Sequence, residues 1–484
     1  METSGTGKIS RMYYRNNFFH IGHLKTLYDN ERVARKNNGV CYAIIDDRQD
    51  ATRISSIQED FDFLCLTHIK TISVKREHQR IINYTLDLVQ AGHVYIYHCD
   101  EKITNIERIH KSLASPKMHF QLRLNCNMGD ADPAIGYTSD DNGSLAVALL
   151  FDYIIKVLDV LLKVTDIITT SQTDIADVKD MHISVFFDKL TNINHCRLDT
   201  YHIHNFRYSK RGWDVDEKNP YLLTIKGLKA RHVPVAVLKA FYLHACQMGS
   251  IKIQFLATLL NKYLFKHSER TLGVIKPVKV HLENWQPKQT EYVCGPKNSY
   301  YSKDIKHYPL SDVIYIDSLD YGIEPGKLNK GRTLPLCYGP VLTCSGISLA
   351  NYQKPVLSGI IELTGSPYSV SSPNAGSNSS PNAGSNSSPN ATPNALGNSD
   401  VKKIHWISAP WDEQPCQAQF VLYNWFYTGF NSLLLPEVVD GFIDNSVFNN
   451  LDKTYHIEHL GYFVYDRERS MESNLPTFIR ICKI

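Results

Sequence analysis

The feature that most constrains the fold is a change of pattern midway along the 484-residue chain. In the first half, strand-like runs such as Val40–Asp46 and Ile69–Lys75 alternate with helical segments such as Ile57–Leu66. Strands and helices that alternate at this spacing predict βαβ units and a parallel sheet. From about Val278 onward, short β-branched and aromatic runs are separated by Gly, Pro and Asn, which is typical of β-barrels and sandwiches. We therefore expect an α/β part followed by a separate all-β part.

Further segments extend both patterns. In the first half we expect helices over Gly22–Lys36 and His78–Val89, a strand over His93–Tyr97, and a buried strand followed by an amphipathic helix within Leu145–Ile168. The strand-like runs of the second half are Val313–Asp317, Leu357–Leu363, Ile404–Ser408, Gln417–Trp425 and Tyr462–Asp466. Several short strands divided by turn residues favour barrels in that half.

Composition leaves the partner of the protein open. Hydrophobic residues at 43% and charged residues at 21% are ordinary for a globular protein, and a net charge of +3 neither requires nor excludes nucleic acid. The 11 cysteines form no C-x-x-C pair, which favours reduced thiols over a disulfide scaffold or a compact metal site. The opening METSGTGKIS lacks an apolar core, and no apolar run reaches membrane-spanning length. We therefore expect a cytoplasmic protein without a membrane partner.

An imperfect repeat, SSPNAGSN-SSPNAGSN-SSPNATPN, lies between Ser371 and Asp400. The repeat contains no residue type that drives burial, so its composition predicts a solvated insert within a loop of the all-β part.

Deletion of Ser371–Ser399 should change the activity and the thermal midpoint very little. Shortening a flexible loop alters its closure entropy only slightly, by about 0.6 kcal/mol for each halving of its length. Thermal denaturation of the deletion variant beside the full chain measures this. A large loss of stability would mean that the repeat is structured.

The sharpest local signal is the tetrapeptide His20-Ile21-Gly22-His23, directly before the expected helix from Leu24. Glycine permits close approach of a ligand to the backbone, and a helix N-terminus favours a phosphate group. Two imidazoles there could donate hydrogen bonds to charge that develops on the α-phosphate of ATP. The alternative is a pair of histidines that only cap the helix and contact solvent.

A second signal, Tyr208-Ser209-Lys210-Arg211, stands where a second phosphate-binding loop is expected. Lys210 would bring a mobile positive charge to the phosphates, and Ser209 a hydroxyl donor. Read alone, the same residues form an ordinary solvated turn. In this order and at this separation, the two motifs resemble the paired signatures of class I aminoacyl-tRNA synthetases.

Longer stretches resemble the glutaminyl-tRNA synthetases and the related eukaryotic-type glutamyl enzymes. The matching segments in the first half are His20–Asp47, Ser56–Leu64, Gln79–Ile96, Gly212–Asp214 and Leu222–Val233. Those in the second half are Glu269–Asn284, Val313–Tyr321, Lys402–Ala409 and His459–Ser470, and these favour the glutaminyl branch. The resemblance covers nearly the whole chain apart from the repeat. It implies a divergent enzyme that uses ATP, accompanied by Mg²⁺, to join glutamine to tRNA(Gln), with no DNA partner.

The resemblance also implies site residues. The residues matching the ATP site are His20, Ile21, Gly22, His23, Leu24, Lys25, Thr26, Thr170, Arg197, Leu198, Tyr208, Ser209 and Lys210. Among these, His20, His23 and Lys210 match catalytic positions. For the amino acid, Asp46 matches the carboxylate that pairs with the α-amino group, and Phe151 stands at the position of a pocket tyrosine. A carboxylate there suits an ammonium, because a charge-assisted hydrogen bond gains most in a dry pocket.

The chain departs from the family around the amino acid. Tyr14 replaces an acidic residue, Ile44 replaces an arginine, Phe151 replaces the tyrosine, and Ile155 replaces a histidine. Loss of hydrogen-bonding groups should weaken discrimination in a polar pocket. Two alternatives therefore stay open beside an active glutaminyl enzyme: a non-catalytic tRNA-binding relative, and a eukaryotic-type glutamyl-tRNA synthetase.

The expected domains follow the resemblance. Residues 1–104 and 146–211 would form the two halves of a Rossmann-like catalytic domain, separated at 105–145 by a shortened insertion that binds the tRNA acceptor end. Residues 212–277 would form a helical region that contacts the tRNA stem. Residues 278–484 would form anticodon-binding β-barrels, with the repeat at 371–400 as an insert.

Overall fold

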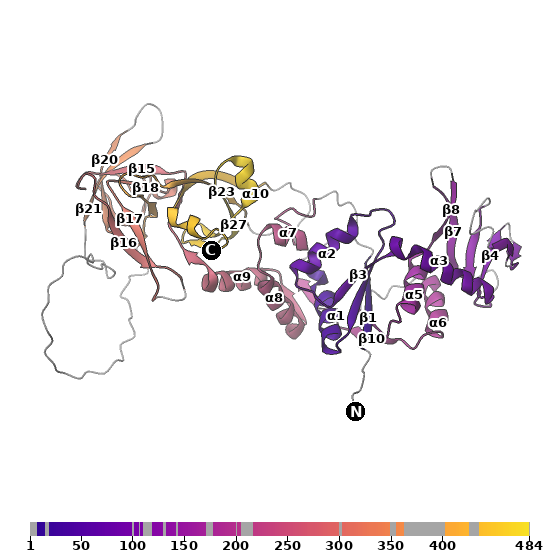
Figure 1. The fold of residues 1–484 in the computed structure, drawn as a ribbon. Helices are drawn as coiled ribbons and strands as arrows, with labels where there is room; N and C mark the ends of the chain where they lie inside the picture. Colours follow the sequence, from indigo (N-terminus) through magenta and orange to yellow (C-terminus); the bar gives the residue numbers. More distant parts are fainter. Residues whose placement is uncertain are drawn as a thin grey trace, which may run out of the picture. The chain divides into compact units, whose positions relative to one another are not determined.

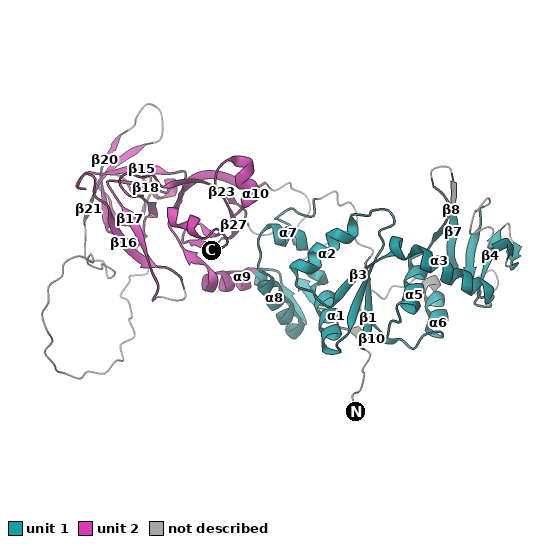
Figure 2. Ribbon diagram, in the orientation of Figure 1, with its two compact units in different colours: residues 1–256, 427–429 teal, residues 257–426, 430–484 magenta. Residues whose placement is uncertain are grey.

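The computed structural model describes residues 7–14, 19–98, 101–105, 107–109, 119–128, 132–141, 144–170, 178–199, 201–204, 216–299, 303–348, 355–362, 402–424 and 435–483. The described residues up to Leu256 form one compact unit, and those from Ala257 onward form a second (Figure 2). Among the described helices, none combines the length and the apolar composition needed to cross a bilayer.

A five-stranded parallel sheet lies at the centre of the first unit (Figure 1). Its strands, in spatial order, are β10 (Asn194–Leu198), β9 (Asp166–Thr170), β1 (Ile9–Tyr14), β2 (Val40–Ile45) and β3 (Ile69–Ser73). The helices between them are α1 (Leu24–Lys36), α2 (Arg53–Phe63), α3 (Val74–Gln90), α5 (Phe151–Leu161) and α6 (Val178–Asp188). The alternation of strands and helices thus gives the predicted α/β part with a parallel sheet.

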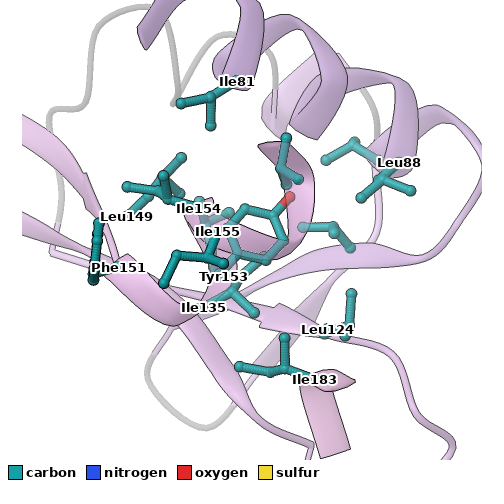
Figure 3. Close-up of a cluster of buried hydrophobic side chains, with 14 of the residues drawn as sticks. Ile81, Leu88, Leu124, Ile135, Leu149, Phe151, Tyr153, Ile154, Ile155 and Ile183 are labelled. Atoms are coloured by element: carbon teal, nitrogen blue, oxygen red, sulfur yellow. The ribbon is translucent and has the colours of Figure 1, made fainter. Parts of the chain in front are cut away.

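A second, antiparallel sheet extends the first unit. Its strands, in spatial order, are β5 (Glu101–Ile103), β4 (Val94–His98), β6 (Gln121–Leu124), β7 (Ala134–Asp141) and β8 (Ser144–Leu149). Residues from one face of this sheet form a hydrophobic core with α3, α5 and α6 (Figure 3). Most residues of helix α5 are buried, and its charged residues Asp152, Lys156 and Asp159 recur on one side, as the predicted amphipathic helix requires.

The strand predicted over His93–Tyr97 exists as β4, but its assignment to the parallel sheet is wrong. Strand β4 is antiparallel to β5 and β6. Val94 and Ile96 lie in the core, and Tyr95 and Tyr97 are directed to the opposite face. Tyr95 is buried there as well, and its hydroxyl donates to the carboxylate of Asp132 at 3.1 Å.

The remaining elements of the first unit follow the α/β core. They are the 3₁₀ turn η1 (Ile21–His23), the parallel pair β11 (His202–His204) and β12 (Ser250–Lys252), and the helices α7 (Ile225–Ala230) and α8 (Val235–Met248). Helix α8 ends at Gly249, whose φ of 68° lies in the left-handed region that glycine adopts without strain. Helix α9 (Gln254–His267) begins in this unit and continues into the second.

The second unit is rich in β-structure, as the sequence predicts. Its seven-stranded sheet has, in spatial order, β13 (Glu269–Arg270), β25 (Thr454–Ile457), β26 (Gly461–Tyr465), β27 (Thr477–Cys482), β23 (Cys416–Leu422), β24 (Glu437–Ile443) and β14 (Gly273–Ile275). Its six-stranded sheet has β19 (Thr333–Pro335), β20 (Val341–Ser348), β21 (Val356–Glu362), β15 (Val278–Leu282), β18 (Val313–Ile316) and β22 (Trp406–Ile407). A hairpin of β16 (Glu291–Pro296) and β17 (Ile305–Leu310), the 3₁₀ turns η4 (Ser318–Asp320) and η5 (Asn445–Asn449), and helix α10 (Arg467–Ser473) complete it.

Each large sheet of the second unit has its own core of buried side chains. Trp406 is fully buried in the core of the six-stranded sheet, and its indole Nε1–H donates to the carbonyl of Cys337 at 2.8 Å. All five strands that the sequence predicts in this half are present, with boundaries shifted by one or two residues in most cases. The repeat lies outside the described residues.

Candidate active site

The motif His20-Ile21-Gly22-His23 forms the tight turn η1 between β1 and α1. His20 is extended, and its imidazole Nδ1 accepts a hydrogen bond from the backbone N–H of Gly22 at 3.0 Å. The backbone N–H of His20 in turn donates to Nδ1 of His23 at 3.1 Å. The two histidines therefore form a reciprocal capping box at the start of the helix.

These two bonds determine where the ring protons are. A neutral imidazole has one N–H and one acceptor nitrogen, and in both rings Nδ1 is the acceptor. The ring proton is therefore on Nε2 of His20 and on Nε2 of His23, with the ring centroids 3.9 Å apart. Capping, one of the two alternatives that the sequence offered, therefore uses Nδ1 of both rings, and phosphate binding stays a prediction. Two N–H donors at a helix N-terminus fit an anionic ligand.

Backbone contacts from a distant segment fix the turn. The N–H of Ile21 donates to the carbonyl of Leu223 at 3.0 Å, and the N–H of Ile225 donates to the carbonyl of Phe19 at 2.9 Å. The hydroxyl of Tyr201 donates to the carbonyl of Ile21 at 3.3 Å. Ile21 itself is fully buried. Three hydrogen bonds from other segments therefore hold the backbone that carries the two imidazoles.

The residues after the motif have mainly structural contacts. Leu24 is fully buried, and the backbone carbonyl of Thr26 accepts from the amide of Asn30 at 2.8 Å. The ammonium of Lys25 lies 2.8 Å from the buried carboxylate of Asp29, which also accepts from the hydroxyl of Tyr242 at 2.6 Å. This network ties α1 to α8.

The candidate residues gather at one edge of the parallel sheet. Asp46 directly follows β2, Thr170 ends β9, and Leu198 ends β10 beside it in register. Strands β2 and β3 lie on one side of β1 in the sheet, and β9 and β10 lie on its other side. In open α/β sheets, ligands bind outside the carboxyl ends of the strands where the strand order reverses in this way. His20 follows β1, the strand next to that point.

Asp46 lies in an ion pair at this edge. Nε and Nη2 of Arg48 donate to its two carboxylate oxygens at 2.8 and 2.7 Å. Burial would raise the pKa of Asp46, but the hydrogen bonds and charge of Arg48 outweigh burial and lower it. Neighbouring Asp47 is buried and accepts from the hydroxyl of Ser73 at 2.5 Å and from the backbone N–H of Lys75 at 2.9 Å. Asp46 is therefore ionised and accessible, whereas Asp47 is structural.

Phe151 belongs to a group of buried apolar side chains with Ile44 and Ile155, here called the apolar wall. Phe151 begins α5 and lies edge-on to Tyr13 of β1, with 6.2 Å between ring centroids. Ile44 and Ile155 are buried in the same hydrophobic cluster, in which Figure 3 labels Phe151 and Ile155. Tyr153 is also buried there, and its hydroxyl is 3.0 Å from that of Thr85. At Ile44, Phe151 and Ile155 the wall therefore offers packing and no hydrogen bond.

Part of the predicted site lies outside the described residues. Tyr208, Ser209 and Lys210 fall there, as do the side chains of Thr170, Arg197 and Leu198. The structure thus brings the two histidines and Asp46 to one sheet edge and leaves the second phosphate loop a prediction.

Two charged residues of this region were missed by the sequence analysis. Arg48 stands two positions after Asp46, so its sequence position was a usable signal. Arg11 of β1 makes a doubly hydrogen-bonded ion pair with Asp159 of α5, at 2.7 and 2.9 Å, and both side chains are buried. These partners are 148 residues apart, and no local pattern points to their pairing.

Curated relatives resemble the chain over most of its length. A probable glutamine–tRNA ligase of Dictyostelium discoideum is 21% identical over 94% of this chain and 63% of its own length. The glutamine–tRNA ligases of Lupinus luteus and Chromobacterium violaceum are each 22% identical, over 71% and 99% of this chain and 50% and 95% of theirs. The chain thus spans less than two thirds of the Dictyostelium and Lupinus relatives. No family model matches it.

Solved structures give more distant matches. A glutamate–tRNA ligase from Elizabethkingia meningosepticum is 11% identical, with a TM-score of 0.30 over 43% of this chain and 52% of that one. A tyrosyl-tRNA synthetase from Leishmania major is 12% identical, with a TM-score of 0.23 over 55% of this chain and 42% of that one.

Proposed function

We propose that this chain, a divergent relative of the glutamine–tRNA ligases, joins glutamine to tRNA(Gln) at the expense of ATP. The observation that carries the proposal is the pair of imidazole Nε2–H donors, fixed at the start of α1 beside the point where the strand order of the sheet reverses. The similarity to glutamine–tRNA ligases along nearly the whole chain supports it.

The reaction has two steps. A carboxylate oxygen of glutamine forms a bond to the α-phosphorus of ATP, the bond to the leaving pyrophosphate breaks, and an adenylate results. A ribose hydroxyl at the tRNA 3′ end then attacks the carbonyl carbon, and AMP leaves. The imidazoles of His20 and His23 would donate to the charge that develops on the α-phosphate during the first step. Lys210 and Ser209 would add the second phosphate contact, and Mg²⁺ would arrive with ATP.

The rest of the chain suits a tRNA partner. We assign the Rossmann-like catalytic role to residues 1–104 and 146–211, acceptor-end binding to 105–145, and stem contact to 212–277. The β-rich region 278–484 would bind the anticodon on barrels, because unpaired loop bases are recognised by stacking and by hydrogen bonds to their edges.

The apolar wall favours a second candidate. Phe151, Ile44 and Ile155 supply no hydrogen bond to the amide of glutamine, and selection of a polar substrate depends on such bonds. A non-catalytic tRNA-binding protein would keep the RNA contacts and lose the amino-acid reaction.

Two measurements test the proposal. Glutamine-dependent exchange of pyrophosphate into ATP, with and without tRNA, should be detected together with charging of tRNA(Gln). The intact chain should also bind glutamine tRNAs with CUG or UUG anticodons more tightly than the same tRNA with an altered middle base, by about 1–3 kcal/mol, the contribution of one stacked base. Anticodon-dependent binding without exchange or charging would select the non-catalytic candidate. Equal affinity for every anticodon would argue against anticodon recognition.

A further inference from the structure

The ion pair between Asp46 and Arg48 differs from an ordinary surface pair. Most exposed ion pairs contribute only about 0–1 kcal/mol, since both side chains move freely in water. Here the side chains are only 25% and 32% exposed, and Nη1 of Arg48 donates to the carbonyl of Leu149 at 2.7 Å. The carbonyl of Asp46 also accepts from Nη1 of Arg53 at 2.8 Å. The pair therefore links the end of β2 to the segment that leads into α5.

Within the part of the chain that the structure describes, the hydrogen bonds of the pair leave part of its capacity unused. A carboxylate has about four lone-pair sites, and Asp46 uses three of them, for Nε, Nη2 and the more distant backbone N–H of Arg48. A guanidinium has five N–H groups, and Arg48 uses three, for Asp46 and Leu149. Asp46 can therefore accept one more hydrogen bond, and Arg48 can donate two more, while the ion pair between them stays intact.

An α-amino acid presents the complementary charges. Its ammonium and its carboxylate are attached to the same carbon, so a receptor needs an anion and a cation as close neighbours. A guanidinium N–H suits a carboxylate oxygen because the hydrogen bond between them is charge-assisted. Ile44, two positions before Asp46 in the chain, supplies no charge.

We propose that Arg48 binds the α-carboxylate of the amino-acid substrate, next to the ammonium that the family resemblance assigns to Asp46. This inference rests on the proposed function and names the residue that orients the substrate for it. A carboxylate held by Arg48 through one oxygen keeps the other oxygen for attack on the α-phosphorus. Arg48 also acts as a positioning residue, because it holds the carboxylate of Asp46 in place.

The pair also predicts a pH effect. Arg48 and the nearby Arg53 lower the pKa of Asp46 against the effect of burial. The pKa of Arg48 is raised in turn, first by its hydrogen bond to Asp46 and also by Tyr137 and Asp47. A lowered pKa keeps Asp46 ionised as the pH falls, so ammonium binding persists into acid. Removal of Arg48 raises the pKa of Asp46, and amino-acid binding should then be lost at a higher pH during acidification.

The test measures binding by calorimetry and needs no catalysis. The ligands are glutamine and 4-aminobutanamide, which lacks the α-carboxylate. Arg48→Gln should weaken glutamine binding about tenfold or more, the usual effect of losing a charged hydrogen bond, and should change binding of the amine far less. Arg48→Lys should restore part of the affinity. Arg80→Gln, which removes a guanidinium from the surface pair with Glu77, is the matched control and should change nothing.

Kinetics and a wider set of ligands separate the possible outcomes. In the active enzyme, Arg48→Gln should raise the KM for glutamine and leave the KM for ATP unchanged. Equal losses for glutamine and for the amine would mean that Arg48 is only structural and would overturn the inference. Binding of a different α-amino acid with the same dependence on Arg48 would support the inference and reject the proposed function. Binding of no α-amino acid would overturn the inference.

Discussion

Replacement of His20 by asparagine should slow adenylate formation about a hundredfold while the protein stays folded. The amide oxygen of asparagine can accept the Gly22 N–H that Nδ1 accepts now, since asparagine is a good helix cap. The shorter side chain loses the Nε2–H donor, and one such donor to a transition state contributes ~3 kcal/mol. His23→Ala and Lys210→Ala should each lower the rate at least about tenfold for the same reason. Single-turnover kinetics measure these rates, and thermal denaturation checks the fold.

The matched control is His78→Ala, because His78 is exposed on α3 and belongs to neither candidate motif. His20→Ala should be less stable than His20→Asn, since it also removes the cap, at a cost of about 1 kcal/mol. A wild-type rate in His20→Asn and His23→Ala would remove the ATP assignment from the motif.

Replacement of Asp159 by alanine should destabilise the first unit by about 3–5 kcal/mol, because the buried guanidinium of Arg11 would lose its counter-charge. For a unit of this size the loss corresponds to a fall of roughly 6–20 °C in the melting temperature. Replacement of both residues, as Arg11→Met with Asp159→Leu, should recover most of the loss, since an apolar pair of similar volume packs without buried charge.

The control for this prediction is Glu77→Gln, which removes the partner of Arg80 in a pair whose guanidinium is 53% exposed, and it should cost less than about 1 kcal/mol. Chemical denaturation followed by circular dichroism gives both free energies. A loss below 1 kcal/mol in Asp159→Ala would show that water or another side chain compensates Arg11.

Local patterns in the sequence are enough to predict most helices and strands here. Helix α3 shows the extent and the limit of this, because Ile81 and Leu88 recur at helical spacing and are buried, whereas Val74, the first residue of the helix, falls in the strand predicted over Ile69–Lys75. Strand order depends on distant partners instead. The run containing Val94 and Ile96 predicts a strand whether its sheet is parallel or antiparallel. Only its pairing with β5 and β6 shows that the sheet is antiparallel.

The candidate site likewise contains local contacts, which the sequence can predict, and long-range contacts, which it cannot. His20, Gly22 and His23 interact within one turn, so their spacing in the sequence already contains their geometry. The bond from Arg48 to the carbonyl of Leu149 spans 101 residues and depends on how β8 and α5 follow β2 in space. Contacts of that kind require the fold before they can be predicted.

Strand β27 has a consequence for the order in which the second unit can assemble. It lies inside the seven-stranded sheet between β26 and β23, and all six of its residues are buried. During synthesis at 5–20 residues per second, about 3–12 s pass between the appearance of β23, a direct partner of β27, and that of β27 itself. The edge of β23 that pairs with β27 is unpaired throughout that interval, and such edges are prone to aggregation. We therefore expect this half of the protein to depend on chaperones while it is being translated.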